Sequence, residues 1–189
     1  MEKTRESMLL KNLLEFYRSP QGENNIHYML DIINESSRVS LRMLDWFVTN
    51  YSKENTKRIM GDTQFSNFNV HNEYKSCLKA FNKKLFDPFC RSNKKKKIDK
   101  FLFYYSKIKP EESIQTTIGQ LNFFKWAIEN NIIEYVERHF DEIKYDIKTK
   151  EKKRKKFGSS TTYSHSSTDE TLNYSSREFT PKDFVISFR

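Results

Sequence analysis

The stretch TTIGQLNFFKWAIENNIIEYV (residues 116–136) decides the fold that we expect for this chain. Thr117 followed by Gln120 has the spacing of a capping box, in which side chains satisfy the free backbone N–H groups at the start of a helix. The pattern predicts a helix from Gln120 to Asn130. Its buried part is supplied by large apolar residues: Leu121, Phe124, Trp126, Ala127 and Ile128.

Further helices are expected on both sides of this stretch, because apolar residues recur there at helical spacing. Their predicted ranges are 6–17, 25–35, 39–51 and 73–84, and a last helix runs from Ile132, after the break at Asn130 and Asn131, toward Lys150. Ser36 or Ser37 is expected to cap the 39–51 helix. Residues 53–69 lose the pattern and predict a loop with at most a short strand at 65–70.

A small β-hairpin is expected near residues 100–117. Five consecutive bulky residues at 101–105 predict a buried strand, and residues 113–116 are its expected partner. Pro88 predicts an extended or turn segment at 86–90, since proline interrupts a helix. The fold class that we predict is therefore mainly α (α+β), with five to six helices and this hairpin.

The composition divides the chain into three parts. We expect a single mainly helical domain at residues 1–150, a basic, Ser/Thr-rich disordered linker at 151–176, and a docking segment or strand at 177–189. No run of about 18 to 20 apolar residues predicts a membrane span, and the N-terminus lacks the apolar core of a signal peptide. These features predict a soluble protein that is not secreted.

Positive charge is concentrated in the middle of the sequence. Residues 71–109 contain twelve lysines and arginines against three acids, so this segment equals the net charge of +9 of the whole chain. Such a field attracts polyanions through counterion release and long-range steering. A nucleic acid, DNA or RNA, is the partner that we expect first.

The residues that we expect to contact phosphates are Lys83, Lys84, Arg91, Lys94, Lys95, Lys96, Lys97 and Lys100. Aromatic residues interleave with them, an arrangement that suits single-stranded nucleic acid. A second interpretation is equally compatible with the run at 94–97: exposed lysines in a solvated loop keep a strand edge from pairing. The sequence leaves both interpretations open.

Familiar catalytic motifs are missing from the sequence. It has no glycine-rich phosphate loop, no nucleophile elbow and no H-E-x-x-H or C-x-x-C motif, and it points to no cofactor and no small-molecule substrate. We therefore expect a protein that is not an enzyme. A metal-dependent nuclease is a third hypothesis, and its test residues would be Asp45 and Asp87.

Metal binding and the acidic residues have simpler interpretations. His71, Cys77, Cys90 and His139 lack the short spacing of structural zinc sites, so we predict no metal site. The acids between 134 and 146 fit a solvated helix face paired with neighbouring cations, which would be Arg138, Lys144 and Lys148. If Asp45 is buried, Arg42 or Arg38 is its expected partner.

Three stretches carry a resemblance to a known group of proteins. They are SLRMLDWFVTNYSKEN (40–55), YKSCLKAFNKKLFDPFCR (74–91) and TTIGQLNFFKWAIENNIIEYV (116–136). Each resembles conserved hypothetical proteins of nucleocytoplasmic large DNA viruses, the mimivirus and phycodnavirus group. The resemblance implies a location in the virion or in the viral factory of the host cytoplasm. It carries over no catalytic residue. The basic run KEKKRKK (residues 150–156) could also serve as a nuclear import signal.

Two hypotheses for the function follow. The first is a non-enzymatic, sequence-nonspecific nucleic-acid-binding protein associated with the virion or with viral transcription. The second is a structural or assembly protein of a viral particle that binds a viral protein partner through its C-terminal segment REFTPKDFVISFR (177–189). The residues expected to contact that partner are Phe184, Val185, Ile186 and Phe188.

Overall fold

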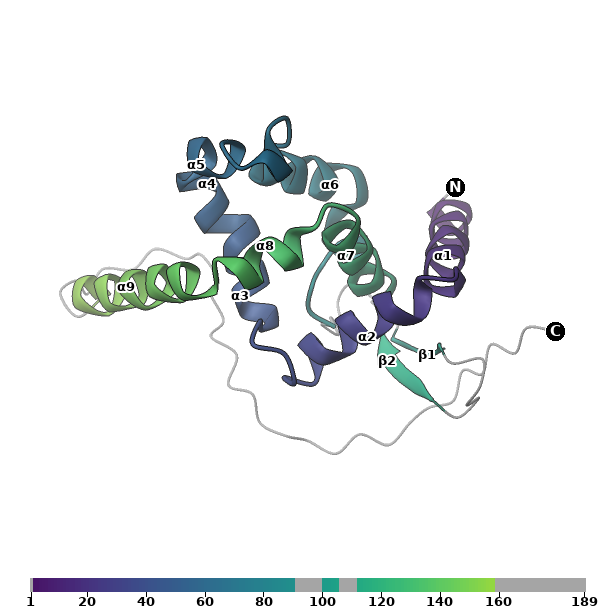
Figure 1. Cartoon of the computed structure of the whole chain (residues 1–189). Helices are drawn as coiled ribbons and strands as arrows, with labels where there is room; N and C mark the ends of the chain where they lie inside the picture. Colours follow the sequence, from purple (N-terminus) through teal and green to yellow (C-terminus); the bar gives the residue numbers. More distant parts are fainter. Residues whose placement is uncertain (1, 91–99, 106–111, 159–189) are drawn as a thin grey trace.

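One helix, α7 (Ile118–Glu129), lies at the centre of the fold. The computed structural model of the protein describes residues 2–90, 100–105 and 112–158 (Figure 1). Most residues of α7 are buried, so its surface must be covered by other elements. The helices that pack against it are α1 (Glu2–Arg18), α2 (Gly22–Ile33), α6 (Val70–Leu85) and α8 (Ile132–Arg138). The predicted class, mainly helical with a small hairpin, is confirmed.

Aromatic side chains fill the contact between α6 and α7. Tyr74 and Phe86 pack against Phe123 and Trp126 of α7, with ring centroids 5.5 to 6.5 Å apart. On the other side of α7, the buried Tyr17 hydroxyl of α1 donates a hydrogen bond of 2.9 Å to the carbonyl oxygen of Leu121. Buried aromatic pairs of this kind contribute about 0.5 to 1.5 kcal/mol each beyond their buried area. They allow a lysine-rich chain to form a compact core.

At the start of α7, the predicted N-cap residue is confirmed, but the predicted capping box is only half formed. Thr117 is the N-cap, and its hydroxyl accepts a hydrogen bond of 3.1 Å from the Gln120 backbone N–H. The Gln120 side chain does not return to Thr117, because it donates to the Pro88 carbonyl at 2.9 Å and accepts from Thr116 at 2.8 Å. Because Thr117 is the N-cap, the helix begins at Ile118, two residues before the predicted start. The predicted break after it is confirmed, with Asn131 in the left-handed region at φ 53°.

The segment between α2 and α6 is more helical than predicted. It contains α3 (Leu41–Trp46), the π-helical turn η1 (Phe47–Tyr51), α4 (Ser52–Glu54), α5 (Thr56–Met60) and the 3-10 turn η2 (Thr63–Phe65). Ser40 caps α3 by accepting from the Met43 N–H, so the prediction of Ser36 or Ser37 is wrong. The predicted loop at 53–69 is also wrong, because buried Ile59 and Phe65 attach short helical turns to the core. Residues 65–70 form no strand.

The hairpin has the predicted position but only one buried face. Strand β1 (Phe101–Tyr104) pairs antiparallel with β2 (Ser113–Thr116), and Phe101 lies opposite Thr116. Phe103 is buried, whereas Leu102 and Tyr104 are 38% and 40% exposed. Alternation of this kind is usual for an antiparallel pair that covers a core with one face. The expectation of a buried strand therefore holds only for the face of β1 that carries Phe103.

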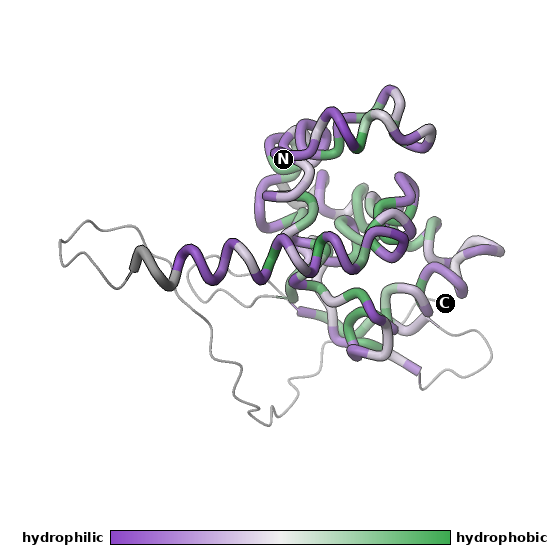
Figure 2. The backbone as a smooth tube through the Cα atoms, turned by 60° about the vertical axis from the view of Figure 1, so that its left-hand side comes forward, coloured by the Kyte–Doolittle hydropathy of each residue, from purple (hydrophilic) through white to green (hydrophobic). Residues whose placement is uncertain are grey.

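The C-terminal helical region is divided and longer than predicted. α8 ends at Arg138, and α9 (Phe140–Gly158) begins directly after the capping residue His139. The linker predicted to begin at residue 151 is helical through residue 158, and the rest of it lies outside the described residues. Figures 1 and 2 both show α9 extending past the other helices, and Figure 2 shows hydrophilic residues predominating along it. Within the described part of the chain there are more helices than the five to six predicted, since this region and residues 53–69 each add some.

Candidate nucleic-acid interface

The structure places three of the phosphate-binding residues predicted from the sequence. Lys83 is exposed near the end of α6, and Lys100 is exposed directly before β1. Lys84 is half-buried and forms an ion pair with Glu6 of α1, so part of its charge is already compensated. The other predicted contacts, Arg91 and the run at 94–97, lie outside the described residues. So do the predicted partner-binding residues of the C-terminal segment, Phe184, Val185, Ile186 and Phe188, and their role stays a prediction.

A kink in α6 determines where Lys83 and Lys84 lie. Asn82 has a φ of 58° inside this helix, a value that residues other than glycine rarely adopt. Its side-chain oxygen accepts a hydrogen bond of 2.8 Å from the Lys84 backbone N–H, a local bond that helps asparagine hold this conformation. The kink therefore turns the last residues of α6 away from the direction of the preceding turns.

The described residues on either side of the lysine-rich segment 91–99 are attached to the same part of the core. On one side, Asn122 and Gln120 of α7 donate hydrogen bonds to the carbonyl oxygens of Leu85 and Pro88, at 2.8 and 2.9 Å. On the other side, β1 pairs with β2, which leads directly into α7. The predicted turn at 86–90 is thus confirmed as a non-helical segment fixed to α7.

A second basic region lies on α9. From residue 144 to 156 the sequence contains eight lysines and arginines against Asp146 and Glu151. Four acids occur in the whole helix, and all of them contact groups outside the lysine-rich outer face. The pairs are Asp141 with Arg38, Glu142 with Arg58, Asp146 with Trp46 and Lys150, and Glu151 with Arg42. Two of these acids, Glu142 and Asp146, lie on the side of the helix away from Lys144 and Lys148, which follow them by two residues.

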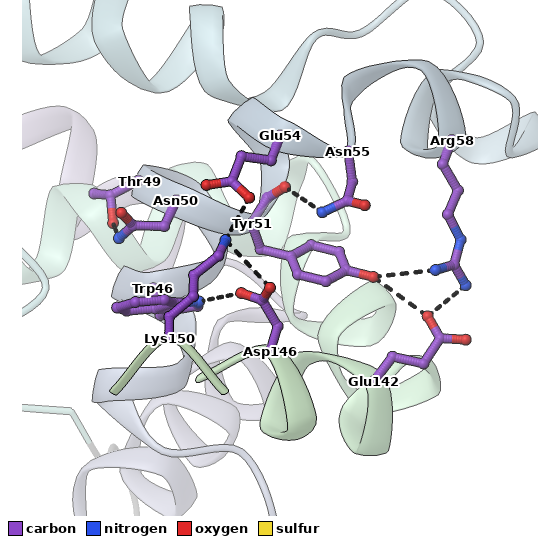
Figure 3. Close-up of polar contacts among 10 residues, drawn as sticks. All are labelled: Trp46, Thr49, Asn50, Tyr51, Glu54, Asn55, Arg58, Glu142, Asp146 and Lys150. Carbon is purple, nitrogen blue, oxygen red and sulfur yellow. Dashed lines mark hydrogen bonds and ion pairs between the residues drawn. The ribbon is translucent and has the colours of Figure 1, made fainter. Parts of the chain in front are cut away.

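The first half of this network joins the start of α9 to η1 and α5. Arg58 forms an ion pair with Glu142 and also donates to the Tyr51 hydroxyl at 3.3 Å (Figure 3). The Tyr51 hydroxyl in turn donates to the same Glu142 oxygen at 3.3 Å, and His139 Nδ1 lies 3.5 Å from it. The Arg58 hydrogen bond holds the pKa of the Glu142 carboxyl below its usual range. Glu142 is therefore ionised at neutral pH.

The second half of the network joins the middle of α9 to α3 and α4. The Trp46 indole N–H donates to Asp146 at 2.8 Å, and Lys150 bridges Asp146 at 3.2 Å and Glu54 at 2.5 Å (Figure 3). Lys150 also lies 5.8 Å from the centre of the Trp46 ring, within the range of a cation–π contact. We refer to the contacts of Glu142, Asp146, Lys150 and Glu151 with these partners as the α9 network.

The π-helical turn helps to bring both halves of the α9 network to one side. Residues five apart in an α-helix point about 140° away from each other. In η1 the Ser52 N–H bonds to the Phe47 carbonyl, five residues back, so a residue lies nearly above the fifth one before it. Trp46 and Tyr51, five positions apart, both reach α9. Burial raises the pKa of the Tyr51 hydroxyl, which therefore stays protonated and able to donate.

The outer face of α9 carries lysines and one exposed aromatic residue. Lys144, Lys148 and Lys152 recur every fourth residue and are exposed, and Tyr145 beside them is 72% exposed. No ion pair to Lys148, Lys152, Lys153 or Arg154 is found within the described residues. We call these exposed residues (Lys144, Lys148, Lys152, Lys153 and Arg154) the α9 basic surface. This surface has the chemistry to bind phosphates.

A signal for the α9 basic surface is present in the sequence, although the same stretch predicts ion pairs within the helix. The acids between 134 and 146 were expected to pair along their own helix with Arg138, Lys144 and Lys148, and that expectation is wrong. Arg138 contacts Gln64 and lies 3.6 Å from Asp62, while Lys144 lies over the Phe140 ring. The recurrence of lysine at every fourth residue from 144 to 152 was the available signal.

Other candidate residues from the sequence lie in separate elements. Asp45 is half-buried in α3. Arg38 and Arg42 form ion pairs with Asp141 and Glu151 of α9. Asp87 lies in the turn after α6. Among the residues that the structure describes, no three His, Cys, Asp or Glu side chains are grouped so as to hold a metal ion. In the same residues, no helix is both long and apolar enough to cross a membrane.

The fold and the charged surface define a mainly helical protein whose last described helix carries a basic outer face. The chain belongs to the family of unknown function DUF7197, whose model matches residues 2–188. It is 49% identical over 129 residues to an uncharacterized protein of Acanthamoeba polyphaga mimivirus, a match that covers 67% of this chain and 48% of that protein. This chain thus spans about half the length of that relative. No solved structure matches the chain. The resemblance to proteins of large DNA viruses is confirmed.

Proposed function

We propose that the chain is a non-enzymatic protein that binds nucleic acid through sequence-nonspecific phosphate contacts, in the virion or in the viral factory. The observation that supports this most is the different environment of acids and cations on α9. Glu142, Asp146 and Glu151 contact residues of other helices, whereas the cations of the α9 basic surface are exposed. Lysines placed in this way release counterions when they meet a phosphate backbone, which is the main source of nonspecific affinity.

The lysine-rich segment supplies a second group of contacts in this proposal. Lys83 and Lys100 are exposed on either side of it, and the flanking residues Pro88 and Phe101 contact α7 and β2. Together with Lys84, Arg91 and Lys94 to Lys97, these two lysines form the phosphate-binding set expected from the sequence. Lys84 contributes less, because Glu6 already compensates its charge.

Binding of labelled DNA and RNA to the purified chain, measured over a range of salt concentrations, tests this function. We expect affinity that falls steeply with salt and depends little on base sequence. A variant in which Lys94, Lys95, Lys96 and Lys97 are all replaced by Ser should bind every sequence more weakly. Unchanged affinity would remove that run from the site. No binding even at about 50 mM salt would overturn the proposed function, since nonspecific affinity is greatest at low salt.

A further inference from the structure

The α9 basic surface has a geometry that narrows the choice among nucleic acids. Lys144, Lys148 and Lys152 are four residues apart, so each lies about 6 Å further along the helix and only about 40° around it. They form one line along α9, and Glu142, Asp146 and Lys150 of the α9 network lie on the other side of the helix. One phosphate backbone could follow this line.

Beyond Glu151 the cations no longer occupy one side. Lys152, Lys153 and Arg154 are consecutive and all exposed, and successive residues of an α-helix are about 100° apart. Positive charge therefore surrounds α9 after its last ion pair with the rest of the protein, Glu151 with Arg42. A helix with cations on several sides suits a groove that has phosphates along both walls.

The major groove of duplex DNA has those dimensions. It is about 12 Å wide, and an α-helix with its side chains is about 10 to 12 Å across. The major groove of duplex RNA is deep and narrow, and side chains do not enter it. Single strands are usually bound on several aromatic side chains, whereas Tyr145 is the one strongly exposed aromatic residue on the described part of α9.

We infer that α9 lies in the major groove of duplex DNA, with the line Lys144, Lys148 and Lys152 along one backbone and Lys153 and Arg154 toward the other. This inference rests on the proposed function and specifies its ligand. Residues 144–154 contain no Asn or Gln, the side chains that pair bidentately with adenine. α9 therefore lacks the usual contact with adenine, and the inference assigns its lysines and Arg154 to phosphates.

The experiment compares three ligands with the full chain: a DNA duplex, the RNA duplex of the same sequence, and one strand of that DNA. The test variant replaces Lys148, Lys152 and Lys153 by Gln, which has nearly the helix propensity of lysine. The control variant replaces Lys11, Lys57 and Lys75 by Gln, so it loses the same charge from exposed positions on three other helices. Circular dichroism establishes that both variants keep the helical content of the wild type.

We expect the wild type to bind the DNA duplex most tightly. In the test variant, the slope of the logarithm of affinity against the logarithm of salt should fall by about 0.9 for each lost phosphate contact, and the control should keep nearly the wild-type slope. Equal or tighter binding of duplex RNA or of the single strand would overturn the inference while leaving the proposed function in place. An equal fall of this slope in the test and control variants would also overturn the inference and leave the proposed function in place. No binding of any ligand at low salt would overturn both.

Discussion

α7 and α9 are attached to the protein by different kinds of contact. In α7, Leu121, Phe123, Phe124 and Ala127 are fully buried. In α9, Ile143 is fully buried, and the attachment otherwise relies on partly buried apolar residues and on the α9 network. Apolar burial is worth about 1.5 to 3 kcal/mol for a large side chain, whereas an exposed ion pair contributes about 0 to 1 kcal/mol.

This difference assigns distinct roles to the two helices. The contacts of α7 are mainly apolar and carry no charge, so they depend little on pH. Their larger apolar burial gives α7 the larger share in the stability of the fold. The α9 network responds to salt and to pH, because its members are charged and partly exposed. It decides mainly where the α9 basic surface lies relative to the rest of the protein. Mutations in the two helices should therefore differ in size and in their dependence on conditions.

Truncation of a buried α7 residue should have the largest effect. Phe123→Ala removes a ring that contacts Tyr74, Phe86 and Trp126 and leaves a cavity. We expect the free energy of unfolding to fall by about 3 to 5 kcal/mol in urea titrations. Tyr145→Ala on α9 is the control with an exposed ring, and it should change stability by no more than about 0.5 kcal/mol. Similar losses in the two variants would contradict the central position of α7.

A smaller loss is expected where α7 closely approaches the end of α6. A Cβ at Gly119 would lie 2.8 Å from the Lys84 carbonyl oxygen and 3.3 Å from the Phe86 nitrogen, both backbone atoms that cannot rotate away. Gly119→Ala should therefore destabilise the protein by about 1 to 3 kcal/mol in the same titrations, as overpacking usually does. Gly61→Ala, whose nearest contact would be 3.3 Å, should cost less. A stable Gly119→Ala variant would show that the 84–87 segment is not held against α7.

The parts of the fold that could be predicted from the sequence depend on short-range signals. The Thr117 cap, the break at Asn131 and the pairing of 101–104 with 113–116 all follow from residues close to one another in the chain. The prediction of a loop at 53–69 is wrong because the helical turns there are stabilised by isolated apolar residues that contact distant elements. A periodic pattern cannot detect such contacts.

The candidate site was predictable only in part, for the same reason. The lysines of α9 and its acids are visible in the sequence, but the partners of the acids are not. Arg58 and Arg42 lie 84 and 109 residues from Glu142 and Glu151 in the chain. Local spacing therefore predicts ion pairs within the helix. Only the fold shows that acids of α9 contact other helices while its lysines stay exposed.

The smallest effect, and the one most dependent on conditions, is expected in the α9 network. Glu142→Gln removes the carboxylate that Arg58 contacts, and it should lower the free energy of unfolding at pH 7 by at most about 1 kcal/mol, because the pair is partly exposed. The pKa of Glu142 is lowered in the folded protein. Its stabilising contribution is therefore complete above the unfolded value of about 4.3 and is lost as the pH falls through the lower folded value.

Asp141→Asn is the matched control, since it removes the same charge from the neighbouring position in the first turn of α9. Asp141 is 89% exposed and lies 4.0 Å from Arg38, so only the general effect of a negative charge near a helix start is lost. We expect the stability difference between wild type and Glu142→Gln to exceed that of Asp141→Asn at pH 7. The two differences should converge below about pH 4, when carboxylates become protonated. If they are equal at neutral pH, the Arg58–Glu142 pair does not hold α9, and its apolar residues Phe140, Ile143 and Ile147 alone must account for the attachment.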